Sequence, residues 1–76
     1  METKQKIRDT LITLLKLKPG ELKDDVRLSD GIGVDSTEMV EFVISLEKVF
    51  GKKLSPKEIT KACTINDIDK IIQSKP

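Results

Sequence analysis

Hydrophobic residues at helical spacing define a first segment over residues 2–18. Pro19 and Gly20 follow it directly. Because proline cannot continue a helix, we expect this helix to end at residue 18. The apolar side chains of the segment recur at i, i+4, i+7 and i+8, the spacing of one helix face, and are Ile7, Leu11, Leu14 and Leu15, with Ile12 widening the stripe.

A second helix is predicted over residues 36–50. Asp35 is its N-cap and Glu38 follows three residues later, a capping box in which each side chain binds the other's backbone N–H. Gly51 stands where a helix most often ends in a left-handed residue. The apolar positions of this segment share the helical period and are Met39, Val40, Phe42, Val43, Leu46 and Phe50.

A third helix start is visible in the run SPKE, residues 55–58. Ser55 suits the N-cap, Pro56 the first helical position and Glu58 the third. This pattern predicts a short helix over residues 56–61.

A fourth start lies at Thr64, an N-cap with Asp67 at the third helical position. It predicts a last helix that runs from residue 65 to residue 73. Its apolar stripe is Ile65, Ile68, Ile71 and Ile72.

The connection over residues 19–34 is long for a compact domain and holds few apolar residues. A loop of this length must be tied to the rest of the molecule. We predict that Leu28 and Ile32 anchor it between the helices. We also expect a helical turn within residues 22–28.

Together these elements predict an all-α fold, a four-helix bundle with three longer helices, one short helix and a long first loop. A chain of 76 residues allows a single domain over residues 1–76. It has no tryptophan or tyrosine and two phenylalanines, so aliphatic side chains must fill its core. That composition suits packed helices better than strands.

Four absences narrow the function. The chain has no histidine, which excludes histidine-based catalysis, and Cys63 is its one cysteine, which excludes an internal disulfide and a cysteine-rich zinc site. The start METKQKIR lacks the apolar segment of a signal peptide, and no apolar run approaches the ~20 residues of a membrane span. We therefore expect a cytoplasmic protein with no membrane span and no metal.

The net charge of +1 conceals three regions. Residues 1–23 hold six Lys/Arg against three Asp/Glu, residues 24–50 hold two against seven, and residues 51–76 hold six against three. The acidic middle opposes binding to a phosphate backbone, so we do not expect a nucleic-acid partner. An acidic field around the second helix is suited to steering protein partners.

Ser36 is the first residue of the second helix, beside backbone N–H groups that lack helical partners. A serine there can be merely structural, because its hydroxyl costs little in a first turn. The same place suits a phosphate, which the N–H groups and the helix dipole attract. No histidine or adjacent lysine is available to activate the hydroxyl as a nucleophile. The arrangement favours a hydroxyl that another enzyme modifies.

The run GVDSTE, residues 33–38, followed by VEFVISLEKVFG, residues 40–51, resembles the attachment-site pattern of acyl carrier proteins. The pattern of that family is Gly-x-Asp-Ser-Leu, then an acidic residue and an amphipathic helix that ends near a phenylalanine. The order of the predicted segments is also similar, so the resemblance covers nearly the whole chain.

The resemblance implies a carrier and not an enzyme. In the family, a phosphopantetheinyl transferase uses coenzyme A and magnesium to attach 4′-phosphopantetheine to the serine that matches Ser36. The thiol of this arm carries acyl groups as thioesters for enzymes of fatty-acid, lipid or polyketide-type biosynthesis, whose basic patches dock on the second helix. We expect a monomer. The matching docking residues are Asp35, Glu38, Val40, Glu41, Ile44 and Glu47.

An acyl chain, where the family shelters one, enters between the helices. The residues expected there are also the predicted core, so packing alone accounts for them equally well. Cys63 lies beside this region and is expected to pack against it. The residues of this acyl-chain pocket are Val43, Leu46, Phe50, Ile59, Ala62, Ile68 and Ile72.

Three departures from the family pattern indicate a specialised carrier instead of the housekeeping fatty-acid one. Thr37 stands where the family usually has leucine, and Lys48 stands where acids are frequent. The near-neutral net charge contrasts with the strong acidity of typical fatty-acid carriers. We expect these differences to change the choice of partners.

Other sites were weighed. A calcium-binding EF-hand loop is excluded because it would place Val26 and Leu28 where carboxylates are needed. A dinucleotide-binding loop is excluded because no strand precedes the glycines. Two alternatives stay open: a peptidyl or aminoacyl carrier, and a helical adaptor whose Ser36 is unmodified.

Overall fold

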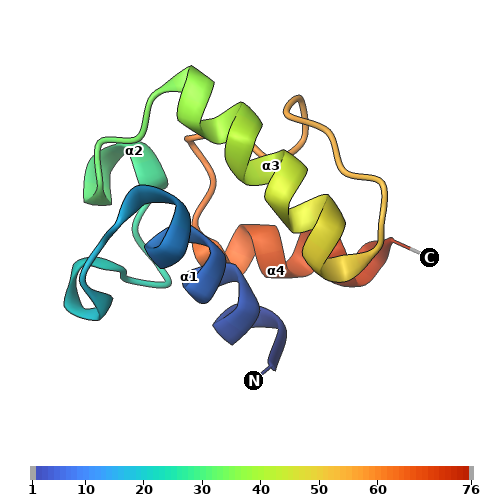
Figure 1. Ribbon diagram of the computed structural model, residues 1–76, viewed down its shortest axis with the longest axis horizontal. Coiled ribbons are helices and arrows are strands. Elements are labelled where there is room, and N and C mark those ends of the chain that lie inside the picture. Colours follow the sequence, from blue (N-terminus) through green and yellow to red (C-terminus); the bar gives the residue numbers. More distant parts are fainter. Residues whose placement is uncertain (1, 76) are drawn as a thin grey trace.

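The structure is a computed structural model that describes residues 2–75 (Figure 1). Helices are the regular elements of this part of the chain, and it contains no strand. The predicted all-α fold of four helices is confirmed, although the short helix lies at residues 28–31 and not at the predicted residues 56–61. The elements in chain order are α1 (Glu2–Leu15), the 3₁₀ turn η1 (Pro19–Glu21), α2 (Leu28–Gly31), α3 (Ser36–Phe50) and α4 (Ile65–Ser74).

The helices enclose one apolar core, and α1 packs against both α3 and α4 (Figure 1). The molecule measures 30 × 26 × 19 Å along its principal axes. Within the described residues, no helix is both long enough and apolar enough to cross a bilayer. As predicted, the core is almost wholly aliphatic. Its buried residues are Ile7, Leu11, Leu28, Val34, Met39, Phe42, Val43, Leu46, Leu54, Ile59, Ile65, Ile68 and Ile72.

The first helix ends at Leu15, earlier than the predicted residue 18. Lys16 adopts a left-handed backbone with φ of 55°. The Leu17 N–H then donates to the Ile12 carbonyl at 3.1 Å, the bond that closes a Schellman-type helix end. Leu17 packs against the core, which accounts for the early turn. The helix has therefore already ended where Pro19 begins.

The predicted helix starts at Asp35 and Thr64, which open α3 and α4, are confirmed as capping boxes. Asp35 Oδ1 accepts from the Glu38 N–H at 2.8 Å, and Glu38 Oε1 accepts from the Asp35 N–H at 3.1 Å. Thr64 and Asp67 exchange the same two bonds, each at 3.1 Å. Gly51 ends α3 with φ of 64°, as predicted.

Backbone hydrogen bonds tie the long connection to the segment before α4. The Leu28 N–H donates to the Cys63 carbonyl at 3.1 Å, and the Ser29 N–H donates to the Lys61 carbonyl at 2.9 Å. Arg27, the residue before α2, makes no side-chain cap bond. The two remote carbonyls take the place of a cap by accepting the first N–H groups of the helix. The connection is thus held by main-chain bonds as well as by side chains.

The predicted anchors of the connection are confirmed. Leu28 is buried, and Ile32 is half-buried against the core. Val34 is buried as well, which the pattern did not single out. The helical turn expected within residues 22–28 is wrong, since the helical turns of the connection are η1 and α2 on either side of it.

The short helix predicted over residues 56–61 is also wrong, because this stretch forms turns. The cap chemistry is present: Ser55 Oγ accepts from the Lys57 N–H at 3.1 Å, and Glu58 Oε2 accepts from the Ser55 N–H at 3.0 Å. A helix this short is marginal unless later bonds extend it. The carbonyl of Lys61 is instead directed to α2.

Candidate functional site

Ser36 is exposed at the first position of α3. The chain reaches this position through Gly33, whose φ of 63° is easily adopted by glycine. Asp35 then has an extended backbone, and its capping box with Glu38 fixes the start of the helix. The cap therefore presents the Ser36 hydroxyl to solvent on a rigid element.

A shallow hollow of about 230 Å³ lies beside Ser36. Its walls come from the first turns of α3 and from the turns before α4. The sequence showed no lysine adjacent to Ser36, but the structure brings Lys61 to the same hollow. The backbone tie between Lys61 and α2 creates this neighbourhood, and no local pattern could have indicated it. The lining residues are Ser36, Met39, Val40, Pro56, Thr60 and Lys61.

The side chains that line the hollow beside Ser36 include a cation but no carboxylate or imidazole that could act as a base. Lys61 as an ammonium offers hydrogen-bond donors and no acceptor. Cys63 is half-buried and packs against the core, as predicted. Its Sγ lies 3.7 Å from the Glu58 carbonyl and 3.8 Å from Thr60 Oγ1, so it is engaged locally. The hollow itself therefore offers no base for the Ser36 hydroxyl.

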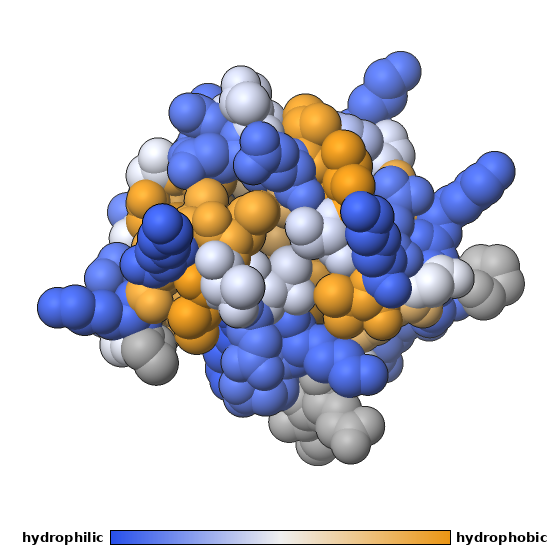
Figure 2. All heavy atoms as spheres, in the orientation of Figure 1, coloured by the Kyte–Doolittle hydropathy of each residue, from blue (hydrophilic) through white to orange (hydrophobic). Residues whose placement is uncertain are grey.

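The outer face of α3 is partly apolar. Val40 and Ile44 are 42% and 47% exposed and lie one helical turn apart. Glu41 beside them is exposed, whereas Glu47 is half-buried. Figure 2 shows apolar atoms at the surface along α3, with polar side chains on either side. Val49 is also exposed, at 46%, and was not among the predicted contact residues.

Asp35 and Glu38 bond to each other's backbone, so part of their acidity serves the cap. Thr37 and Lys48, the two residues that depart from the family pattern, are both exposed on α3. Of the acids predicted for docking, Glu41 is thus the one that is both exposed and outside the capping box.

Known proteins match this chain over nearly its full length. The model of a family described as phosphopantetheine attachment site matches residues 5–69. The chain is also 31% identical over 74 residues to an acyl carrier protein of Campylobacter hominis, a match that covers 97% of this chain and 94% of that protein. This chain belongs to the acyl carrier protein family. Membership implies a covalently attached 4′-phosphopantetheine, and it makes the chain a carrier.

The hollow beside Ser36 has the chemistry that the attached end of such an arm needs. That end is a phosphodiester followed by a branched, apolar dimethyl segment. Lys61 supplies a positive charge, and lysine is a common partner of phosphate. Met39, Val40 and Pro56 supply apolar surface next to it. The residues present therefore fit the arm of an acyl carrier protein.

Most residues predicted to line an acyl-chain pocket of this carrier lie in the tightly packed core. Phe50 is half-buried against that core. Ala62 is exposed, contrary to the prediction, because it lies in a turn and not on the inner face of a helix. The fully buried members are Val43, Leu46, Ile59, Ile68 and Ile72.

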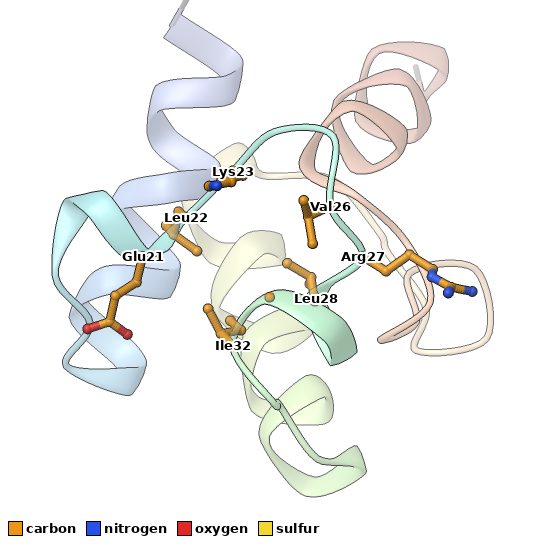
Figure 3. A pocket seen from close by; sticks show the side chains of 8 residues that line it. Glu21, Leu22, Lys23, Val26, Arg27, Leu28 and Ile32 are labelled. Carbon is orange, nitrogen blue, oxygen red and sulfur yellow. The ribbon is translucent and has the colours of Figure 1, made fainter.

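A second hollow, of about 220 Å³, opens in the connection between η1 and α2. Leu22, Val26, Leu28 and Ile32 point toward one another around it, while Arg27 points away (Figure 3). The sequence predicted two of these residues as anchors but did not predict a hollow. Its walls are apolar and its rim is charged.

Proposed function

We propose that this chain carries acyl groups as thioesters on a 4′-phosphopantetheine arm attached to Ser36, in the cytoplasm. It would present them to enzymes of fatty-acid, lipid or polyketide-type biosynthesis. One observation supports the site most directly: the exposed hydroxyl at the first residue of α3, in a member of the acyl carrier protein family. When bound, the arm supplies a terminal thiol on which the acyl group is held.

Attachment is a phosphoryl transfer to Ser36. A bond forms between Ser36 Oγ and the phosphorus of the pantetheine phosphate, the pyrophosphate bond of coenzyme A breaks, and 3′,5′-ADP leaves while the hydroxyl loses its proton. Since no group in the hollow can accept that proton, a phosphopantetheinyl transferase must supply the base, with magnesium. The role of this chain is to hold the hydroxyl in the open on a capped helix.

We propose the outer face of α3 as the docking surface for the transferase and the other enzymes. Val40 and Ile44 offer apolar contact, and Glu41 beside them offers a negative charge. The acidic field also includes Asp35 and Glu38, whose carboxylates bond within the capping box, and Glu47, which is half-buried. Exposed charges speed encounter and select partners but add little affinity, which suits a carrier that must exchange partners quickly.

We propose that this carrier is specialised. On its docking face, Lys48 and Thr37 stand among few free acids, so the face is less acidic than the family pattern. A partner with a weaker basic patch and more apolar surface would fit it better. The basic regions before and after the acidic middle also support a partner with a weaker basic patch, because they offset the negative charge of that middle region.

The acyl chain, in this proposal, enters among the buried residues between α3 and α4. Val43, Leu46 and Ile68 are fully buried, so these helices must move apart to admit a chain. Ile59 and Ile72 would line the same space, with Phe50 at its edge. A bound acyl chain would thus replace some of the contacts that these side chains make with one another.

The proposed function is tested by intact mass after incubation with coenzyme A, magnesium and a broad-specificity phosphopantetheinyl transferase. The native protein is expected to gain the mass of one arm. Ser36→Ala is expected to gain nothing yet to keep its helical circular dichroism and urea midpoint, because alanine is the best helix former.

Ser74→Ala is the matched control, since Ser74 is also an exposed serine at a helix end. It should be loaded like the native protein. A folded native protein that starts at its unmodified mass and gains none would reject the carrier proposal and favour an unmodified helical adaptor.

A further inference from the structure

Lys61 is a free cation beside the modification site. Its side chain is exposed and lines the hollow that also contains Ser36. Among the side chains that the structure describes, it takes part in no ion pair, whereas other cations do, such as Arg8 with Asp24 and Lys75 with Glu58. An unpaired ammonium at this place is available to a negatively charged ligand.

The backbone around Lys61 is held in place. Its carbonyl accepts the Ser29 N–H at 2.9 Å, and the Cys63 N–H donates to the Thr60 carbonyl at 3.0 Å. Thr60 Oγ1 also accepts the N–H of Ala62 at 3.3 Å. Because the turn is fixed to α2 and within itself, the Lys61 side chain starts from a fixed point beside the hollow.

A negative group on Ser36 would need such a cation. Asp35 and Glu38 flank Ser36 in the sequence, and their capping bonds hold both carboxylates at the same helix start. A phosphodiester on Ser36 adds a further negative charge close to both, and like charges at short distance repel one another. A nearby ammonium would offset that repulsion.

We propose that Lys61 is the counter-ion of the phosphodiester on Ser36, and that it holds the attached end of the arm against Met39, Val40 and Pro56. This proposal rests on the proposed function, because it needs the arm to be on Ser36. It makes Lys61 a positioning residue: the arm leaves the protein from a defined direction, over the apolar side of the hollow.

The test compares the apo and loaded forms of three variants with the native protein. Lys61→Met removes the charge and keeps the length, Lys61→Arg keeps the charge, and Lys70→Met removes an exposed charge from α4 as the matched control. Intact mass first verifies loading, with excess transferase and long incubation. Urea unfolding and the ³¹P chemical shift of the phosphodiester are then measured.

We expect Lys61→Met to leave the apo form unchanged and to raise the unfolding equilibrium constant of the loaded form about twofold to fivefold at low salt, the usual scale for an exposed charge pair. The difference should shrink at about 1 M salt, where screening acts within about 3 Å. The ³¹P shift should move in Lys61→Met alone, and Lys61→Arg should restore both measurements.

Equal effects on the apo and loaded forms, or a ³¹P shift that does not change, would overturn the role of Lys61 while leaving the carrier intact. A variant that only slows loading would also overturn it, because Lys61 would then contact the transferase and not the phosphodiester. If the native protein itself cannot be loaded, the carrier function fails first, so the two failures are distinguishable.

Discussion

Single residues decide where the helices of this carrier begin and end. Lys16 adopts a left-handed conformation that costs an L-residue about 1–2 kcal/mol. The Leu17 N–H bond and the packing of Leu17 compensate for that cost. At the start of α3, the Asp35 side chain accepts a hydrogen bond from the backbone N–H of Glu38, and the neighbouring Ser36 hydroxyl stays exposed. The site is thus a consequence of how a helix start is satisfied.

Lys16→Gly is expected to raise the free energy of unfolding by about 0.5 kcal/mol. Glycine adopts the left-handed conformation without strain, and its greater freedom in the unfolded chain removes part of the gain. Urea unfolding followed by circular dichroism measures the effect. The control is Lys18→Gly, an exposed position without a positive φ, which should be neutral or destabilising. Equal losses in both variants would refute strain at Lys16.

At the scale of elements, local capping signals predicted α3 and α4 correctly, because the groups that satisfy their first N–H donors lie within three residues. The start of α2 is satisfied by the carbonyls of Lys61 and Cys63, which lie far away in the sequence, so no local pattern could reveal it. The same bonds explain why the Ser55 cap leads only to turns. Lys61 was not predicted beside Ser36 for this reason, whereas Ser36 could be predicted as the attachment residue because its signal is local.

Two variants of Asp35 distinguish its role as a helix cap from its proposed role in docking. Asp35→Ala is expected to lower the free energy of unfolding by about 1 kcal/mol, because it removes the acceptor for the Glu38 N–H. Asp35→Asn keeps an acceptor and should stay within about 0.3 kcal/mol of the native protein. Urea unfolding of both variants measures this difference.

If the Asp35 charge also steers partners, Asp35→Asn should be loaded more slowly by the transferase at low salt, with the deficit lost at high salt. Loading at the native rate would remove Asp35 from the docking set. An Asn variant as unstable as the Ala variant would show that the charge, and not the capping bond, stabilises α3.

At the scale of the whole molecule, charged side chains join segments that are distant in sequence. Arg8 on α1 binds Asp24 in the connection, with Nε 2.9 Å from Oδ1. Lys75 after α4 binds Glu58 in the preceding turns at 2.6 Å. Lys52, just after α3, donates from its Nζ to two carbonyls at the end of α4, at 3.1 and 3.3 Å. These contacts close the bundle around its core.

The two ion pairs set how the fold responds to acid. The hydrogen bond from Arg8 lowers the pKa of Asp24, and that from Lys75 lowers the pKa of Glu58. A carboxyl whose pKa is lower in the folded state contributes stability above its unfolded pKa, and this stability is lost as the pH falls through the folded pKa. Stability should therefore decline as the pH falls below about 4.

Asp24→Asn is expected to lower the free energy of unfolding by less than about 1 kcal/mol at neutral pH, because the pair is partly exposed. Its stability should also fall less steeply than that of the native protein below about pH 4. Urea midpoints across this range provide the measurement. Asp25→Asn is the control, since Asp25 is exposed and joins no ion pair within residues 2–75. A loss of stability below about pH 4 as steep as that of the native protein would contradict the role of the Arg8–Asp24 pair.

The central claim is that the arm is attached to Ser36, and the most direct measurement is its location in the loaded protein. Trypsin releases residues 28–48 as one peptide, which also contains Ser29, Thr37 and Ser45. Fragmentation in a mass spectrometer then assigns the added mass to one residue. The account predicts the full mass of the arm on Ser36, with the other three hydroxyl residues unmodified. An arm on any of those three, or a peptide without an arm after loading conditions, would contradict it.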